Sequence, residues 1–326
     1  MAAPVKSARQ ATPRKVVDKP DRADRWFLGL TRSAGLTVLL LLALVGFFLF
    51  WQSRGAFEFM GLRFFTTESW KTTTDPKTLG VLGLLSGTVL VAIVAVTLAV
   101  PLAVCAALFI VEYASPRGRS YLTALVDLLA AIPSLLFGLW GFAFLVPQLV
   151  PVEEWLGTYF GWFPLFHTDG GQSYKGTIFI AGCVVSLMVL PIIASITREV
   201  FAQVPQGEKE AALALGGTRS GMIRAVVLPY GKGGIIGGSM LGLGRALGET
   251  IAVALLLPQI PAIHTNVLQN GGATVSGFIS INGGAEPFTT SGLMAAGLVL
   301  FGLTFATNVI ASFIVSRSRS GAGVDI

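Results

Sequence analysis

Two opposite charges lie one helical turn apart in one of the most apolar stretches of the chain. Residues 243–250 read LGRALGET, with Arg245 and Glu249 between the runs GGIIGGSMLG and IAVALLL. At 1.5 Å per residue, Arg245 would lie roughly 18 Å from the nearer end of a spanning helix. Such a buried charge is costly in lipid and is by default a functional group. We expect Arg245 to lie on a substrate pathway together with Thr250, with Glu249 holding and moderating the arginine charge. The alternative is a buried ion pair that only fixes helix packing.

Glycines at helical spacing accompany this charged pair. Gly234, Gly238 and Gly242 share a stripe with Arg245 and Glu249 when residues are placed about 100° apart around a helix. Small residues at this spacing let helices approach closely in a membrane. We therefore predict that these glycines pack the helix into a bundle and that the charged stripe faces protein or a water-filled path.

The composition indicates a membrane protein. Of the 326 residues, 53% are hydrophobic and 12% are charged, whereas ordinary globular domains carry about 25% charged residues. A helix needs roughly 20 apolar residues to cross the hydrocarbon layer. Runs of this kind predict an all-α polytopic protein with six transmembrane helices, at 33–51, 80–110, 121–147, 177–203, 233–257 and 292–315.

Basic residues predict the orientation of these spans. With the N-terminus inside, seventeen of the 23 Lys and Arg residues fall in cytoplasmic segments and five in outer loops, as the positive-inside rule requires. The net charge of +6 then needs no nucleic acid partner. We predict a multi-pass protein of a bacterial cytoplasmic membrane with both termini cytoplasmic. Its parts are a disordered basic tail (1–32), an additional N-terminal transmembrane helix (33–51), an extracytoplasmic loop (52–79), a transmembrane core (80–316) and a second cytoplasmic tail (317–326).

The inner loop at 204–232 carries a spaced motif. Residues 208–215 favour a short helix. A fixed pattern of one acidic residue followed by small and apolar residues runs through and beyond it: Glu210, Ala211, Ala212, Gly216, Val226, Leu228 and Pro229. This pattern resembles the EAA motif of ATP-binding-cassette (ABC) import permeases, EAA-x3-G-x9-I-x-LP, with Val226 in place of Ile. The resemblance implies a type I importer (MetI-like) core whose loop forms a coupling helix that seats in a cleft of the ATPase subunit. The alternative is an ordinary amphipathic connector.

A closer resemblance rests on three stretches. LLAAIPSLLFGLWG at 128–141 and GGSMLGLGRALGETIAV at 237–253, together with the EAA loop, look like the permeases of phosphate-specific ABC importers of the PstC type. That resemblance implies import of inorganic phosphate by alternating access. It also implies a PstA-type permease partner, a PstB-type ATPase dimer and a PstS-type extracytoplasmic phosphate-binding protein. Phosphate suits Arg245, because guanidinium offers planar bidentate donors to an oxyanion.

Several other kinds of chemistry find no support in the sequence. A nucleotide-binding loop needs GxxxxGK[ST]; GGQSYKGT at 170–177 reverses its Lys and Gly, and GLGRALG at 242–248 lacks the dinucleotide spacing. We therefore expect a permease, not an enzyme, with no cofactor of its own and with ATP bound by the partner. Cys105 and Cys183 are expected to pack as small apolar residues. His167 and His264 are isolated, so no metal site is predicted.

Asp127 and the substrate leave alternatives open. Asp127 lies about two turns into the third predicted span, where it could serve the pathway or pair with a basic group near the inner face. The substrate could be another oxyanion, such as sulfate, molybdate or phosphonate. A stand-alone channel or secondary transporter is a further alternative, against which the EAA loop argues, because such proteins have no ATPase to couple to.

Overall fold

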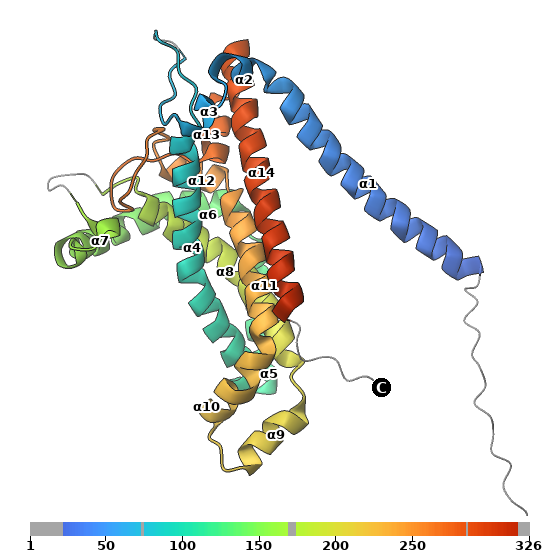
Figure 1. Ribbon diagram of the computed structural model, residues 1–326. Helices are drawn as coiled ribbons and strands as arrows, with labels where there is room; N and C mark the ends of the chain where they lie inside the picture. The colour runs from blue at the N-terminus through green and yellow to red at the C-terminus, as the bar shows by residue number, and fades with distance from the viewer. Residues whose placement is uncertain (1–21, 73–74, 169–173, 285, 319–326) are drawn as a thin grey trace, which may run out of the picture. The chain divides into compact units, whose positions relative to one another are not determined.

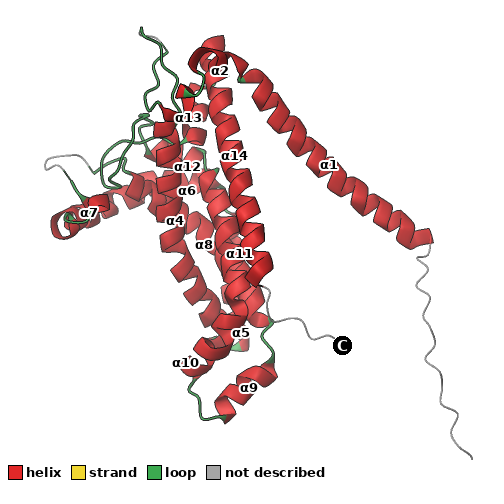
Figure 2. Cartoon of the chain, viewed as in Figure 1, coloured by secondary structure: helices red, strands yellow, loops and turns green. Residues whose placement is uncertain are grey.

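The computed structural model describes residues 22–72, 75–168, 174–284 and 286–318 (Figures 1 and 2). In these ranges the regular structure is helical apart from three isolated bridges, which confirms the all-α class. Five helical stretches among them are long and apolar enough to cross a membrane: 23–52, 82–113, 134–160, 178–202 and 287–316. The chain is therefore a multi-pass membrane protein. It divides after Phe48 into two units, which we describe separately.

The first unit contains most of helix α1 (Arg22–Gln52). Its run of apolar residues is long enough to cross a membrane. The helix begins well before residue 33, so the prediction of a disordered tail up to residue 32 was wrong for residues 22–32. The last proline of the tail is Pro20, and Asp24 lies in the first turn, where the helix dipole favours an acidic residue. Residues 1–21 and 319–326 of the predicted tails lie outside the described part.

Two short helices occupy the segment predicted as an outer loop. These are α2 (Arg54–Met60) and α3 (Arg63–Thr66). Phe64 is fully buried, and its carbonyl accepts a hydrogen bond from the Val81 amide at 3.0 Å. The ring of Trp70 packs edge-on to Phe278 with centroids 5.3 Å apart. Residues 53–72 and 75–81 therefore pack over the ends of other helices in the second unit.

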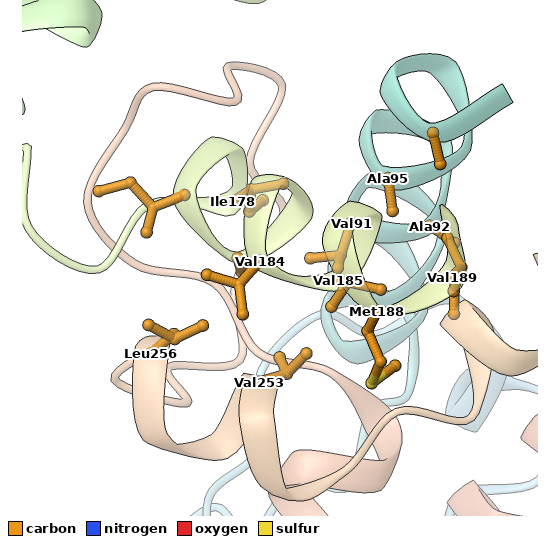
Figure 3. Packing of buried hydrophobic residues seen from close by; sticks show 14 of the residues in the cluster. Val91, Ala92, Ala95, Ile178, Val184, Val185, Met188, Val189, Val253 and Leu256 are labelled. Atoms are coloured by element: carbon orange, nitrogen blue, oxygen red, sulfur yellow. The ribbon is translucent and has the colours of Figure 1, made fainter. Parts of the chain in front are cut away.

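Helices α4 (Leu82–Leu108) and α8 (Ile178–Ala202) form the centre of the second unit and correspond to the spans predicted at 80–110 and 177–203. Figure 3 shows Val91, Ala92 and Ala95 of α4 beside Val185 and Val189 of α8. Small side chains allow this approach, and a Cβ added at Gly182 would lie 2.4 Å from Val94 Cγ1. Beyond Leu108, α4 continues as a π-helix, η1 (Phe109–Tyr113).

The third span predicted at 121–147 was wrong in its bounds. Helix α5 (Pro116–Ala131) stops before Pro133, and Ile132 takes the extended backbone (ψ 129°) that a following proline favours. Helical structure resumes as α6 (Ser134–Trp140), η2 (Gly141–Leu145) and α7 (Val146–Phe160), followed by a short 3-10 turn, η3 (Pro164–Phe166). Helix α7 projects to the side of the long helices (Figure 1).

The rest of the second unit runs from an inner-loop segment to the last long helix. Helix α9 (Gln206–Ala214) is followed by α10 (Arg219–Met222) and η4 (Ile223–Val227), which continue directly into α11 (Leu228–Leu247). After α12 (Ile251–Leu256) and α13 (Val275–Asn282), the last described helix is α14 (Pro287–Ser318), which corresponds to the predicted span 292–315. Helices α9 and α10 lie at the end of the bundle opposite α2 and α13 (Figure 1).

Candidate functional site: the end of helix α11 and the inner-loop segment

Helix α11 packs against α8 through the predicted glycines. A Cβ added at Gly234 would lie 2.4 Å from Val200 Cγ2, and one at Gly242 would lie 2.7 Å from Ile193 Cδ1. At Gly238 it would lie 3.3 Å from the Ile193 carbonyl oxygen. Glycine is therefore what lets the two backbones come this close, and any larger residue on this stripe pushes α11 away from α8.

The span predicted at 233–257 is not one continuous helix. Helix α11 ends at Leu247, and α12 begins at Ile251, so Glu249 lies in a break between two helices. The Glu249 Oε1 atom accepts a hydrogen bond from the Ala252 amide at 3.4 Å, and its carbonyl accepts one from Ser276 Oγ at 2.5 Å. These contacts satisfy backbone groups that a break would otherwise leave unpaired in the membrane.

Because the helix breaks, Arg245 and Glu249 do not form the predicted pair. The ion pairs between described residues do not include Arg245 with Glu249. The Glu249 residue is 8% exposed, whereas Arg245 is exposed in the last turn of α11. The prediction placed Arg245 and Glu249 on one stripe because it assumed a continuous helix. The helix ends before Glu249, at the turn at Gly248, so the helical spacing does not extend to Glu249. Thr250 also belongs to the break, where its Oγ1 donates to the Gly248 carbonyl at 3.1 Å.

Asp127 lies away from this break. Its Oδ1 is 3.8 Å from Arg198 Nη2, with the two side chains 53% and 12% exposed. Arg198 also donates from Nη2 to Ser195 Oγ at 3.3 Å. Of the two alternatives for Asp127, this geometry favours pairing with a basic group.

The predicted motif residues of the inner loop fall on α9 and on the start of α11. Glu210 and Ala211 are exposed on α9, whereas Ala212 packs partly against an apolar cluster. Gly216 follows the helix with φ +85°, a conformation that side chains with a Cβ rarely adopt. Leu228 and Pro229 are the first two residues of α11, directly after the π-helix η4. The motif thus describes an exposed helix, its stop and the entry into the membrane helix.

Sequence analysis missed two buried carboxylates. Glu112 of η1 accepts a hydrogen bond from Lys209 Nζ at 2.6 Å, and each side chain is 8% exposed. Glu153 of α7 is fully buried, and its Oε1 accepts a hydrogen bond from Thr177 Oγ1 at 2.5 Å. The neighbouring Glu153 and Glu154 in a largely apolar helix were the available signal, although the pattern does not say which of the two is buried. No spacing rule connects residues 112 and 209, so that pair could not be found from the sequence.

The fold is that of a multi-pass helical membrane protein. It has a tightly packed centre, a helix break beside an exposed arginine and a helical segment at one end of the bundle. The sequence profile described as "Binding-protein-dependent transport system inner membrane component" matches residues 99–320. The chain belongs to this family, and so it is the permease component of an ABC import system.

Individual relatives agree with this assignment. The chain is 42% identical over 305 residues to "Phosphate transport system permease protein PstC 2" of Mycobacterium tuberculosis, covering 92% of this chain and 94% of the relative. It is 37% identical over 329 residues to "Phosphate transport system permease protein PstC" of Mesorhizobium japonicum, covering 98% and 97%. Among solved structures, the fold resembles a chain of a bacterial alginate ABC transporter in complex with a pentasaccharide-bound periplasmic protein. That match has a TM-score of 0.54 at 16% identity and covers 91% of this chain and all of the other.

Proposed function

We propose that this chain is the PstC-type permease subunit of an ATP-driven importer that moves inorganic phosphate across the cytoplasmic membrane. Relatives named as phosphate permeases, aligned over more than nine-tenths of both chains, support the substrate. The observation that carries the proposal is Arg245: it is exposed at the end of α11, beside a helix break, and it has no ion-pair partner among the described residues.

The chemistry of the break fits an oxyanion. Phosphate is a mono- or dianion near neutral pH, and a guanidinium group can donate two parallel hydrogen bonds to it. Glu249 caps α12 in this structure, so its carboxylate does not occupy the guanidinium. Arg245 is therefore available to an anion that passes along the exposed side of α11.

Transport needs partners that supply energy and substrate. The proposed assembly contains a PstA-type permease, two copies of a PstB-type ATPase and a PstS-type phosphate-binding protein outside the cell. The exposed face of α9, with Glu210 and Ala211, is the surface proposed to dock on the ATPase. ATP-driven closure of the ATPase dimer would move α9 and rock the helices around the break. If α9 docks on the ATPase, which is cytoplasmic, then α9 and both termini lie in the cytoplasm in the proposed orientation.

Reconstitution tests the proposal. The chain is co-expressed with a PstA-type permease and a PstB-type ATPase, purified, and placed in liposomes with a PstS-type binding protein outside. We expect accumulation of radiolabelled phosphate that requires ATP and that excess sulfate or molybdate does not suppress. Sulfate or molybdate uptake in place of phosphate would overturn the substrate. Phosphate flux without ATP would overturn the importer mechanism and favour a channel.

A further inference from the structure

A buried ion pair connects the inner-loop segment to the end of helix α4. Lys209 of α9 and Glu112 of η1 are 97 positions apart in the chain, yet Lys209 Nζ lies 2.6 Å from Glu112 Oε1. The rest of α9 faces outward for the most part, so Lys209 is the one charged side chain of this helix that is buried. Water screens neither charge well. Removing one partner would therefore leave the other charge buried and unpaired, which is strongly destabilising.

Neighbouring contacts hold the same two parts together. The Arg219 guanidinium lies over the ring of Tyr113, 5.5 Å from its centroid, so the next residue of η1 holds the next helix of the inner-loop segment. Beneath them is an apolar cluster formed by buried residues of α4, α8, α10 and η4 and of the chain just after α8: Ala107, Phe201, Val204, Met222, Ile223 and Val227. Residues 205–227, which we call the coupling segment, are therefore attached to the inner end of α4 on two sides.

Helix α4 leads from this attachment to the break beside Arg245. Toward its other end, Thr88 Oγ1 accepts a hydrogen bond from the amide of Val275, the first residue of α13, at 3.0 Å. The next residue, Ser276, donates its hydroxyl to the Glu249 carbonyl at 2.5 Å. A displacement of η1 can therefore reach the break through the adjoining helix α4 and two buried hydrogen bonds, without passing through α11 itself.

We propose that Glu112 and Lys209 are positioning residues that transmit the movement of the coupling segment to α4, and through α13 to the helix break beside Arg245. The inference rests on the proposed function, because it assumes that an ATPase moves α9. On this account the pair stays intact through the transport cycle, and its loss separates ATP hydrolysis from phosphate movement.

The test compares uptake with ATP hydrolysis in the reconstituted complex. The variants are Lys209→Met, Glu112→Gln and their combination, with Lys209→Arg as the conservative change. Arg119→Gln, an exposed charge of α5, is the control. We expect hydrolysis to continue in each single variant while phosphate imported per ATP falls about tenfold, within the usual range of coupling between sites. The combination should fall no further than either single variant, because the two residues act as one unit. Lys209→Arg and the control should keep the parent ratio.

Two results would overturn the inference. One is a proportional loss of uptake and hydrolysis at equal recovery of complex, which is what a purely structural pair would give. The other is a combined variant that imports as much phosphate per ATP as the parent. Because this variant leaves no unpaired charge, it tests the inference even if a single variant fails to assemble. Failure of the proposed function looks different, because the parent complex itself would then not import phosphate.

Discussion

The contact between α11 and α8 predicts a large effect of adding one methyl group. In a Gly234→Ala variant the new Cβ would lie 2.4 Å from Val200 Cγ2 and 2.6 Å from its Cβ. Rotating the valine side chain cannot relieve the second contact, because that Cβ is fixed to the backbone. Carbon atoms pack best at about 3.5–4.0 Å, so α11 must move by about 1 Å to accommodate the methyl group.

A matched variant separates this clash from helix propensity. Gly237→Ala lies on the same helix, and its Cβ would be 3.7 Å from Val315 Cγ2, an ordinary contact. Alanine favours a helix over glycine by about 1 kcal/mol at both positions, so the difference between the variants measures the clash. Overpacking of this kind costs about 1–3 kcal/mol. We therefore expect Gly234→Ala to be less stable than Gly237→Ala by that amount.

Thermal unfolding of the purified complex in detergent is the assay. The expected result is a Tm for Gly234→Ala several degrees below that of Gly237→Ala, with a parallel loss of phosphate uptake. Equal Tm values for the two alanine variants would refute the reasoning, because they would mean that α11 and α8 do not approach as closely as the structure has them.

Three further predictions concern single residues. Glu249→Ala removes the side-chain acceptor of the Ala252 amide and should lower stability by about 0.5–2 kcal/mol, whereas Glu249→Gln keeps an acceptor and should unfold near the parent Tm; equal loss in both would contradict a capping role. Gly216→Ala forces a Cβ into φ +85° and should cost about 1–2 kcal/mol, seen as lower recovery of ATPase with the permease; unchanged recovery would show that another conformation serves as well. Thr177→Val removes the hydroxyl that donates to Glu153 and should destabilise the protein by about 1–3 kcal/mol in the same Tm assay; a Tm equal to that of the parent would contradict a stabilising role for this hydrogen bond.

Periodicity and composition predicted much of this architecture. The errors lie where a helix begins or ends at a position that these patterns did not predict. Long apolar runs were sufficient to find α4, α8 and α14. They failed at the third span, because the apolar run 121–147 extends across Pro133, whereas the chain ends α5 and starts α6 there and the membrane-length helical stretch is 134–160. They also failed at the start of α1, where basic residues suggested disorder but nothing after Pro20 opposes a helix.

In the candidate site, too, helical spacing predicted some contacts and not others. Glycine spacing correctly placed Gly234, Gly238 and Gly242 toward one neighbour, because each lies before the break and keeps helical phase. Glu249 lies after the break, where helical phase no longer applies, and a hydroxyl from α13 with no sequence link to it satisfies its carbonyl. Local patterns therefore predicted contacts within α11 but not the tertiary contacts that hold its end.

The central claim is that Arg245 contacts the transported anion, and uptake by Arg245→Gln tests it most directly. The measurement is ATP-dependent phosphate uptake by the reconstituted complex, beside Arg245→Lys, Arg119→Gln and the parent, with the recovery of complex determined in each. We predict that Arg245→Gln loses uptake while the complex is recovered in full and still hydrolyses ATP. Arg245→Lys should retain part of the uptake, because it keeps the charge without the bidentate geometry. Uptake at the parent level in Arg245→Gln would contradict the account.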